Sequence, residues 1–312
     1  MKKSRILVVG STNMDLFMNV YKIPESGETV TEDGGVAYMP GGRGASAATA
    51  FAKLGQETYV STKLGQDLHG QKLYQFFRDT GVVTSEIKVD SELPTGLSVI
   101  IREGDGTCRT ISYPGANSGL TADNIEAAFA TSPEALYISL ELPMPVVVAA
   151  MRAAEVRGVP VFVDATPASA DIALEKLPYC EVFSPNEEET EKFVGTRPMG
   201  ADASLRAALA LYKRVKCKYI VIKQGDRGAF IYDGKHYFMI PPVRAGRTVD
   251  TSGAGDAFGA GLVSSYLASD GDIKNAVQFG VVLGAMAITK KGTLSSLPTE
   301  AEVMDFLKNQ TV

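Results

Sequence analysis

Short β-branched runs alternate with amphipathic segments of helical spacing along most of the chain. The runs predict strands at residues 6–9, 58–61, 97–101, 135–140, 159–163, 181–183 and 219–222. The segments between them predict helices at 44–54, 70–79, 122–130, 145–157, 187–194 and 201–215. Strands that alternate with helices pair in parallel, and a parallel sheet needs helices on both faces. The alternation therefore predicts an α/β protein with a mainly parallel central sheet.

Two regions interrupt this alternation. Residues 15–39 and 96–113 alternate apolar with polar side chains around Gly and Asp turns, which predicts two hairpins. Hairpins inserted in an α/β chain suggest a small projecting sheet that serves as a lid or an oligomer contact. Later helices are predicted at 253–268, 272–289 and 299–309. Because no linker or repeat divides the chain, residues 1–312 are predicted to form one domain that carries this lid.

Composition narrows the function classes. The net charge is −5 and Lys and Arg are dispersed, so no nucleic-acid surface is expected. No apolar run approaches the roughly 18 residues of a membrane span, and no signal-peptide pattern is visible. The three cysteines lack the spacing of zinc or redox motifs, which favours a reducing cytoplasm. With only two histidines, any chemistry is expected to rest on carboxylates and backbone amides.

The most informative segment is 249–258, VDTSGAGDAF, where polar residues and glycines lead into a helical pattern. A glycine-rich helix start offers free N–H groups and the positive end of the helix dipole, which together bind anions. Asp256 lies in this first turn, aimed at the same space and kept ionised by the N–H groups. An anion site beside a carboxylate suits phosphoryl transfer to a hydroxyl. The same spacing fits an ordinary first-turn carboxylate with glycines that serve packing.

A second glycine cluster, PGGRGAS at 40–46, also begins a helix. It lacks the G-x-G-x-x-G register and a strand directly before it, which disfavours a dinucleotide site. Close backbone approach to a small polar ligand, with Arg43 supplying charge, fits better, and so does a simple helix-capping turn. No G-x-x-x-x-G-K-[ST], H-R-D or D-F-G motif occurs. A kinase with this sequence belongs to another class than the P-loop and protein kinases.

Five motifs together resemble the ribokinase-like (pfkB-type) carbohydrate kinases. They are GSTNMD at 10–15, GGRG at 41–44, PGAN at 114–117, NEEE at 186–189 and DTSGAGD at 250–256. They follow the family's order over essentially the whole chain, and the last is the most specific. The resemblance implies a three-layer α/β/α sandwich with a β lid. It also implies an ATP-dependent kinase that phosphorylates a primary hydroxyl of ribose or a close furanose.

The resemblance also implies roles for individual residues. Asp256 is the expected base, and the expected anion hole is Gly253, Ala254 and Gly255. The expected sugar-binding residues are Asn13, Asp15, Gly41, Gly42, Arg43, Ser46, Glu141 and Asp256. The expected nucleotide-binding residues are Asn186, Lys223, Gly225, Asp226, Arg227, Gly228, Gly255 and Val281. Without the resemblance, Glu141 is a carboxylate at a strand end, and residues 223–228 are a plain hairpin turn.

Two metal ions are expected on the same grounds. Asn186 and Glu189 would hold Mg²⁺ through water, because magnesium dehydrates reluctantly. The same two residues also fit a helix N-cap with first-turn acids, and both roles can hold together. The segment 287–296 resembles the loop with which ribokinases bind a monovalent cation. The implied K⁺ ligands are Asp250, Ser252, Ala287, Lys290, Gly292 and Ser296.

The sugar loop departs from the usual ribokinase pattern G-G-K-G-A-N-Q. Arg43 replaces Lys, and Ser46 replaces an Asn whose amide would reach a sugar hydroxyl. A nucleoside or a larger ketose such as fructose therefore stays open as the substrate, as does a non-catalytic sugar sensor. The resemblance favours a homodimer through the lid. The apolar lid residues Leu97, Val99, Ile101 and Ile111 fit that contact, or a cover over substrate within one subunit.

Overall fold

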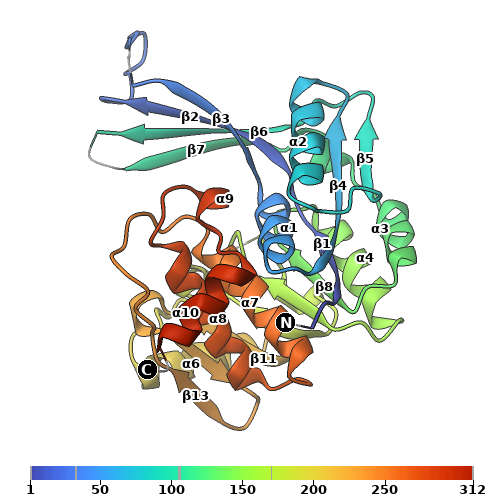
Figure 1. Cartoon of the computed structure of the whole chain (residues 1–312), viewed down its shortest axis with the longest axis vertical. Helices are drawn as coiled ribbons and strands as arrows, with labels where there is room; N and C mark the ends of the chain where they lie inside the picture. Colours follow the sequence, from blue (N-terminus) through green and yellow to red (C-terminus); the bar gives the residue numbers. More distant parts are fainter. Residues whose placement is uncertain (1, 32–33, 105–106, 170, 311–312) are drawn as a thin grey trace.

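The central sheet has the predicted, mainly parallel topology. The computed structural model describes residues 2–31, 34–104, 107–169 and 171–310. In these residues nine strands form one sheet of order β13-β12-β11-β10-β9-β8-β1-β4-β5 (Figure 1), and only β12 runs antiparallel to the others. In that order the strands are Tyr237–Ile240, Ala229–Tyr232, Cys217–Lys223, Cys180–Ser184, Val161–Asp164, Ala135–Ser139, Arg5–Val9, Glu57–Gly65 and Ile87–Asp90.

Helices cover both faces of this sheet. One buried cluster packs the sheet against α1 (Arg43–Lys53), α2 (Leu68–Asp79), α7 (Ala254–Ala268), α8 (Ile273–Ala287), α9 (Thr293–Ser296) and α10 (Glu300–Gln310). The other packs it against α3 (Ala122–Ala128), α4 (Met144–Glu155), α5 (Glu187–Val194) and α6 (Ala201–Tyr212). Apolar side chains on both sides of each inner strand account for both clusters. The predicted three-layer α/β/α sandwich is confirmed.

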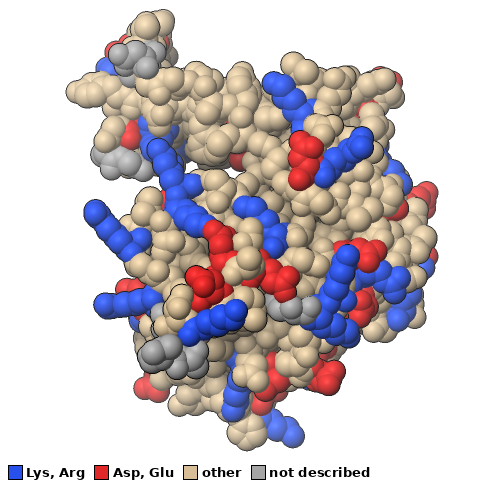
Figure 2. Space-filling model, in the orientation of Figure 1, with Lys and Arg blue, Asp and Glu red and all other residues tan. Residues whose placement is uncertain are grey.

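The two predicted hairpins form a second sheet. Its strands are β2 (Asn13–Val20), β3 (Val36–Gly41), β6 (Gly96–Glu103) and β7 (Cys108–Tyr113), in the order β3-β2-β6-β7. Strands β2 and β6 pair in parallel, so the two hairpins lie side by side. The sheet projects from the body above α9 (Figure 1). Figure 2 shows a hollow between this lid and the body, and mixed acidic and basic side chains on the face below it.

The strand register gives the lid two chemically different faces. Asp15 pairs with Ser98, so their side chains share one face. Leu16 pairs with Val99, which pairs with Ile111, so these lie on the opposite face. Ile111 is 68% exposed. The apolar lid residues therefore face away from the polar pair.

The strand order places a ligand site at one edge of the central sheet. From β1 the chain first builds outward through β4 and β5, and it then returns to the other side of β1 as β8. Ligands of α/β proteins bind at such a switch point, beyond the carboxyl ends of the strands. The loops that follow β1 and β8 carry Ser11 and Glu141.

Some elements differ from the sequence expectations. Strand β3 runs directly into the glycine cluster, which was expected to have no strand before it, but β3 belongs to the lid and not to the parallel sheet. Strands β5, β12 and β13 were not predicted. Strand β5 has only four residues, and the edge strand β13 exposes Tyr237 and Met239, so neither presents the continuous apolar run of the inner strands. Across the described ranges, no helix is both long and apolar enough to cross a bilayer.

Candidate active site

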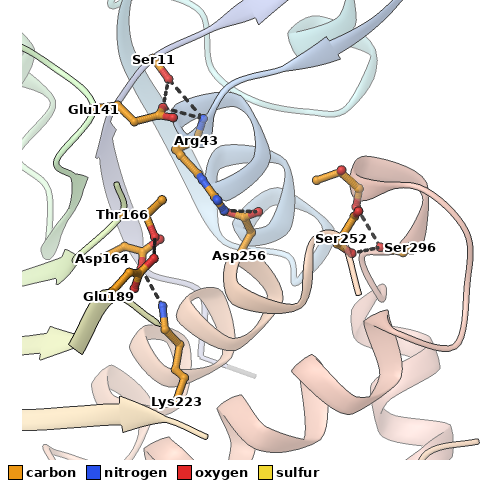
Figure 3. Close-up of polar contacts among 11 residues, drawn as sticks. Ser11, Arg43, Glu141, Asp164, Thr166, Glu189, Lys223, Ser252, Asp256 and Ser296 are labelled. Carbon is orange, nitrogen blue, oxygen red and sulfur yellow. Dashed lines mark hydrogen bonds and ion pairs between the residues drawn. The ribbon is translucent and has the colours of Figure 1, made fainter. Parts of the chain in front are cut away.

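The start of α7 holds a buried carboxylate without a hydrogen-bond partner. Gly253 is the N-cap at φ +79°, and Asp256 lies in the first helical turn, 1% exposed. Neither carboxylate oxygen of Asp256 has a hydrogen-bond partner within the described chain. The Arg43 Nη1 atom lies 3.7 Å from Asp256 Oδ2 (Figure 3). The carboxylate therefore faces a cation and keeps its full hydrogen-bonding capacity for a ligand.

Burial sets the protonation equilibrium of Asp256. It raises the pKa of this carboxyl from 3.8 to about 6, against the lowering effect of Arg43. Burial lowers the pKa of Arg43, but Asp256 and further carboxylates raise it overall, so the guanidinium stays charged. A carboxylate with a pKa about one unit below neutrality is ionised at pH 7 and is a competent proton acceptor.

Close backbone contacts bring Arg43 to this position. Gly42 caps α1 at φ +87°, and Gly44 N–H donates to the Ser11 carbonyl at 2.8 Å. A Cβ on Gly44 would lie 2.6 Å from the Gly10 carbonyl oxygen, so the end of β1 and the start of α1 need glycine here. The cluster thus joins β1 to α1 and directs Arg43 across to α7.

Glu141 lies at the same junction. Its carboxylate accepts hydrogen bonds from the Ser11 hydroxyl and, at 3.2 Å, from the Arg43 backbone N–H (Figure 3). A carboxylate at a helix N-terminus is favoured by the dipole. The predicted residues Arg43 and Glu141 therefore meet at the switch point.

Asp15 extends from the lid into this region. Burial raises its pKa to about 6, and its Oδ1 atom is buried without a hydrogen-bond partner within the described residues. A Cβ on Gly41 would clash with this carboxylate, which is the close packing that a glycine there permits. Like Asp256, the half-buried Asp15 has a carboxylate with unused acceptor capacity.

Asn13 and Ser46 have other surroundings. The Asn13 amide accepts from Asn117 Nδ2 at 2.9 Å and donates to Ser98 Oγ at 3.4 Å, so it orders the base of the lid. Ser46 lies in α1 and is only 4% exposed, so little of its side chain is available to a ligand.

A second polar group lies next to α7, at the carboxyl ends of β9 to β11. Asn186 and Glu189 form a reciprocal capping box at the start of α5, at 2.7 and 2.8 Å, and Thr166 Oγ1 also donates to Glu189. Lys223 Nζ lies 2.7 Å from Asp164 Oδ1 (Figure 3). Asn186 bridges to Lys223 through the backbone, so two predicted nucleotide residues are adjacent.

The donor set suits Mg²⁺ only indirectly. Both Glu189 oxygens already accept hydrogen bonds, and the described residues contain no group of three His, Cys, Asp or Glu arranged to hold a metal ion. Each carboxylate oxygen keeps a second lone pair, which can accept from a metal-bound water. The residues fit a hydrated Mg²⁺ carried on phosphates.

Four further predicted nucleotide residues, Gly225, Asp226, Arg227 and Gly228, form the turn between β11 and β12. A Cβ on Gly228, at φ +84°, would clash with the Ile240 carbonyl, so packing against β13 explains this glycine. Arg227 pairs with Glu187 at the start of α5, next to Asn186. Val281 lies in α8, 8% exposed in the core cluster.

Four of the six predicted K⁺ ligands, Asp250, Ser252, Gly292 and Ser296, lie together. Asp250 accepts from the Ser252 and Gly292 N–H groups, both at 3.0 Å. Ser296 Oγ donates to the Ser252 carbonyl at 3.4 Å (Figure 3). A Cβ on Gly253 would lie 3.0 Å from that Ser296 oxygen, so these oxygens lie directly behind the start of α7. An oxygen-rich loop of this kind suits a hard cation.

Sequence reasoning missed Asp164, Thr166 and Ser11 as members of the site. Asp164 is the last residue of β9, and its signal is the one that Glu141 showed, a carboxylate at a strand end. Ser11 lies within the GSTNMD motif. Thr166 follows Asp164 by two residues in a loop, and no local pattern distinguishes it.

Comparisons with known proteins agree with this geometry. The model of the pfkB family of carbohydrate kinases matches residues 3–300. A ribokinase of Haemophilus influenzae is 30% identical over 311 residues, covering 98% of this chain and 99% of its own. A deoxyribokinase of Salmonella typhi is 28% identical over 304 residues, covering 97% and 98%. The structure of Arabidopsis thaliana ribokinase complexed with ribose and ATP superposes with a TM-score of 0.87 at 25% identity, covering 98% and 99%. The chain therefore belongs to the pfkB family of carbohydrate kinases and is a sugar kinase of the ribokinase branch.

Proposed function

We propose that this protein transfers the γ-phosphoryl group of ATP to a primary hydroxyl of ribose or a closely related furanose, with Asp256 as the base. The observation that carries this proposal is the Asp256 carboxylate, which is buried and unpartnered within the described chain beside Arg43 and the start of α7. A buried acceptor left unsatisfied in the free protein is costly, and a sugar hydroxyl would satisfy it.

The transfer follows from these groups. The sugar hydroxyl gives its proton to Asp256 as its oxygen bonds to the γ-phosphorus. The bond from that phosphorus to the β,γ-bridging oxygen breaks, and ADP leaves with the electron pair. The N–H groups of Gly253, Ala254 and Gly255 bind the charge on the phosphoryl oxygens. The positive charge of Arg43 lies beside Asp256 and also attracts the phosphoryl oxygens. Asn186 and Glu189 would hold Mg²⁺ through water, and the ion would neutralise part of the phosphate charge.

The sugar is held between lid and body. Asp15 has the free acceptor capacity to bind two adjacent hydroxyls, and the backbone of Gly41 and Gly42 approaches closely enough to join it. Glu141 and Arg43 close the other side of the pocket. Closure of the lid excludes water, which would otherwise accept the phosphoryl group.

A monovalent cation behind the anion hole is part of this proposal. The oxygens of Asp250, Ser252 and Ser296 converge directly behind Gly253. A cation there would strengthen the field at the start of α7 without touching substrate. Turnover in potassium, sodium and a bulky organic cation tests this, and equal rates in all three would refute it.

The apolar lid face supports a homodimer through the lid. Val36, Tyr38, Ile111 and Tyr113 are each 49–68% exposed, and the register sets their side chains opposite Asp15 and Ser98. Because this face points away from the substrate side, contact with a second copy of the chain would bury its apolar side chains, whereas a bound sugar would not. The molecular mass in solution tests this part.

The experiment that tests the activity is a coupled ADP-release assay with ATP, Mg²⁺ and K⁺. The acceptor panel contains ribose, deoxyribose, fructose, other pentoses and hexoses, and purine and pyrimidine nucleosides. We expect ribose or deoxyribose to lead. A leading fructose or nucleoside would show that Arg43 and Ser46 mark a changed pocket. Sugar binding without any turnover would identify a sensor and overturn the kinase proposal.

A further inference from the structure

Lys223, so far only an expected nucleotide-binding residue, forms a buried ion pair with Asp164 that the proposed transfer does not yet use. Lys223 ends β11 and Asp164 ends β9, and their side chains are 14% and 2% exposed. The distance of 2.7 Å makes this a direct charge-assisted hydrogen bond. Burial of two opposite charges is weak evidence for stability, because the desolvation penalty offsets the attraction. The pair therefore invites a functional explanation.

The ammonium lies at the helix start that binds the transferred group. A Cβ built on Gly255 meets only one atom within 4 Å among the described residues, and that atom is Lys223 Nζ, at 4.0 Å. The missing side chain leaves the ammonium facing the first turn of α7. A phosphoryl oxygen bound by the N–H groups of that turn lies beside Lys223.

The positive charges near the start of α7 favour a bound anion. Lys223 and Arg43 both stand near the positive end of α7, which disfavours two cations there. Asp164 compensates Lys223 in the free protein and occupies one of its three N–H donors. The other donors remain for ligand oxygens.

Asp164 is also what orients the ammonium. A small cavity lined by Tyr137, Phe162, Phe258 and Lys223 lies beside the pair, and none of these three neighbours offers the ammonium a charged partner. The ion pair to Asp164 directs the ammonium toward α7.

We propose that Lys223 is a catalytic residue that binds the transferred phosphoryl group, and that Asp164 is the positioning residue that orients it. This inference rests on the proposed kinase function. Lys223 donates hydrogen bonds to a non-bridging oxygen of the γ-phosphoryl group and gives up no proton. The hydroxyl proton still goes to Asp256, and ADP still leaves with the electron pair of the broken bond. The interaction strengthens as the phosphoryl group moves toward α7, which lowers the barrier.

A purely structural pair would behave differently. If Lys223 only neutralised Asp164, then Lys223→Gln would harm the protein by leaving a buried carboxylate unpaired. The double variant Asp164→Asn/Lys223→Gln removes both charges and keeps a hydrogen-bonding amide pair. If the role of the pair is structural, the double variant should regain both Tm and kcat. If the ammonium is catalytic, the double variant should regain Tm but not kcat.

The experiment compares the two single variants, the double variant and Lys218→Gln. Lys218 is the matched control, because it pairs with Glu181 at 2.7 Å near the other end of β11 and is 47% exposed. For each protein we would measure kcat, the KM values for sugar and ATP, the Tm, and the Kd of Mg²⁺-ATP by calorimetry without sugar.

We expect Lys223→Gln to lower kcat roughly 100- to 1,000-fold, as loss of one transition-state donor does. The double variant should stay within a few-fold of that value while its Tm returns toward wild type. The sugar KM of Lys223→Gln should stay unchanged, and so should kcat, both KM values and the Mg²⁺-ATP Kd of Lys218→Gln. Near-wild-type kcat in the double variant, or in Lys223→Gln itself, would overturn the inference.

The calorimetry separates this inference from the proposed function. A wild-type protein without turnover on any acceptor would refute the kinase function. In that case a weaker Kd of Mg²⁺-ATP in both Lys223→Gln and the double variant would still support Lys223 as the phosphate ligand. An unchanged Kd in both would refute it as well.

Discussion

The two sheets of this molecule divide the work between them. Every residue of β8 and β9 is buried, between helices on both faces. Every residue of β7 in the lid is exposed, and the lid carries an apolar face on which Val36, Ile111 and Tyr113 are exposed while Tyr38 stacks on His69 of α2. The central sheet positions Glu141, Asp164 and the helix that carries Asp256, while the lid contributes Asp15. In the proposed function, the reacting groups therefore lie on the rigid central sheet and its helices, and a substrate-selecting group lies on the part with few buried contacts.

The largest effect on activity is expected from Asp256, on the helix that the central sheet positions. Asp256→Asn should lower kcat about 1,000-fold or more, within the range for loss of general-base catalysis. Sugar binding, measured by calorimetry, should change little. Residual activity within tenfold of wild type would show that another group accepts the proton.

The same variant should fold at least as stably as wild type above pH 6. The folded pKa of Asp256 is raised above its unfolded value, so its contribution to stability is lost as the pH rises through about 6. A neutral Asn avoids that loss, which is at most about 3 kcal/mol for a shift of this size. Thermal unfolding at pH 5 and pH 8 measures it, and the gain of Asp256→Asn over wild type should be larger at pH 8 than at pH 5, because the wild-type loss is still incomplete at pH 5.

A smaller effect is expected from the lid. Asp15→Ala should lower kcat/KM for the sugar roughly 10- to 100-fold, the value of a hydrogen bond to a charged group. The KM for ATP should stay unchanged, because the phosphate site is on the body. Asn19→Ala is the control, since Asn19 lies on the same strand and bonds only the Gly34 carbonyl among its recorded partners. An equal loss in both variants would place Asp15 outside the sugar site.

The pH profile of activity tests the body and the lid together, because each carries a carboxyl group with a raised pKa. The pKa values of Asp256 and Asp15 both lie at about 6. Both groups must be ionised, so kcat/KM should fall as the pH falls through about 6. Asp15→Asn should leave one group to titrate and a shallower acid limb. A profile flat down to pH 4.5 would contradict both assignments.

The smallest effect on the chemistry is expected at the outer lid face. Ile111→Glu places a charge on an exposed apolar position and should convert a dimer to a monomer, seen by sedimentation or light scattering. Its effect on the free energy of unfolding of the monomer should stay within about 0.5 kcal/mol. A monomeric wild-type protein would show that this apolar face is not a dimer contact. The outer face of the lid would then also be a candidate for contact with the sugar.

Local sequence patterns predicted much of the fold and part of the candidate site. Apolar periodicity predicted the inner strands and both hairpins, because a buried strand and a half-buried strand differ in every second residue. The Gly-rich start of α7 predicted an anion site with Asp256 in its first turn, and this is where the residue lies. Ser46 shows what such patterns leave open, because its burial within α1 depends on tertiary packing and its contact with sugar stays a prediction.

The sequence by itself determined the α/β architecture, the lid and the helix start with its carboxylate, since each depends on neighbours within a few residues. Only the tertiary structure decided that Arg43 reaches Asp256 and that Lys223 pairs with Asp164, across 213 and 59 positions of the chain. Such contacts depend on how strands are ordered in the sheet and how closely glycines let backbones approach. The charge on a residue is written in the sequence, but its partner, and therefore its pKa and its role, is set by packing.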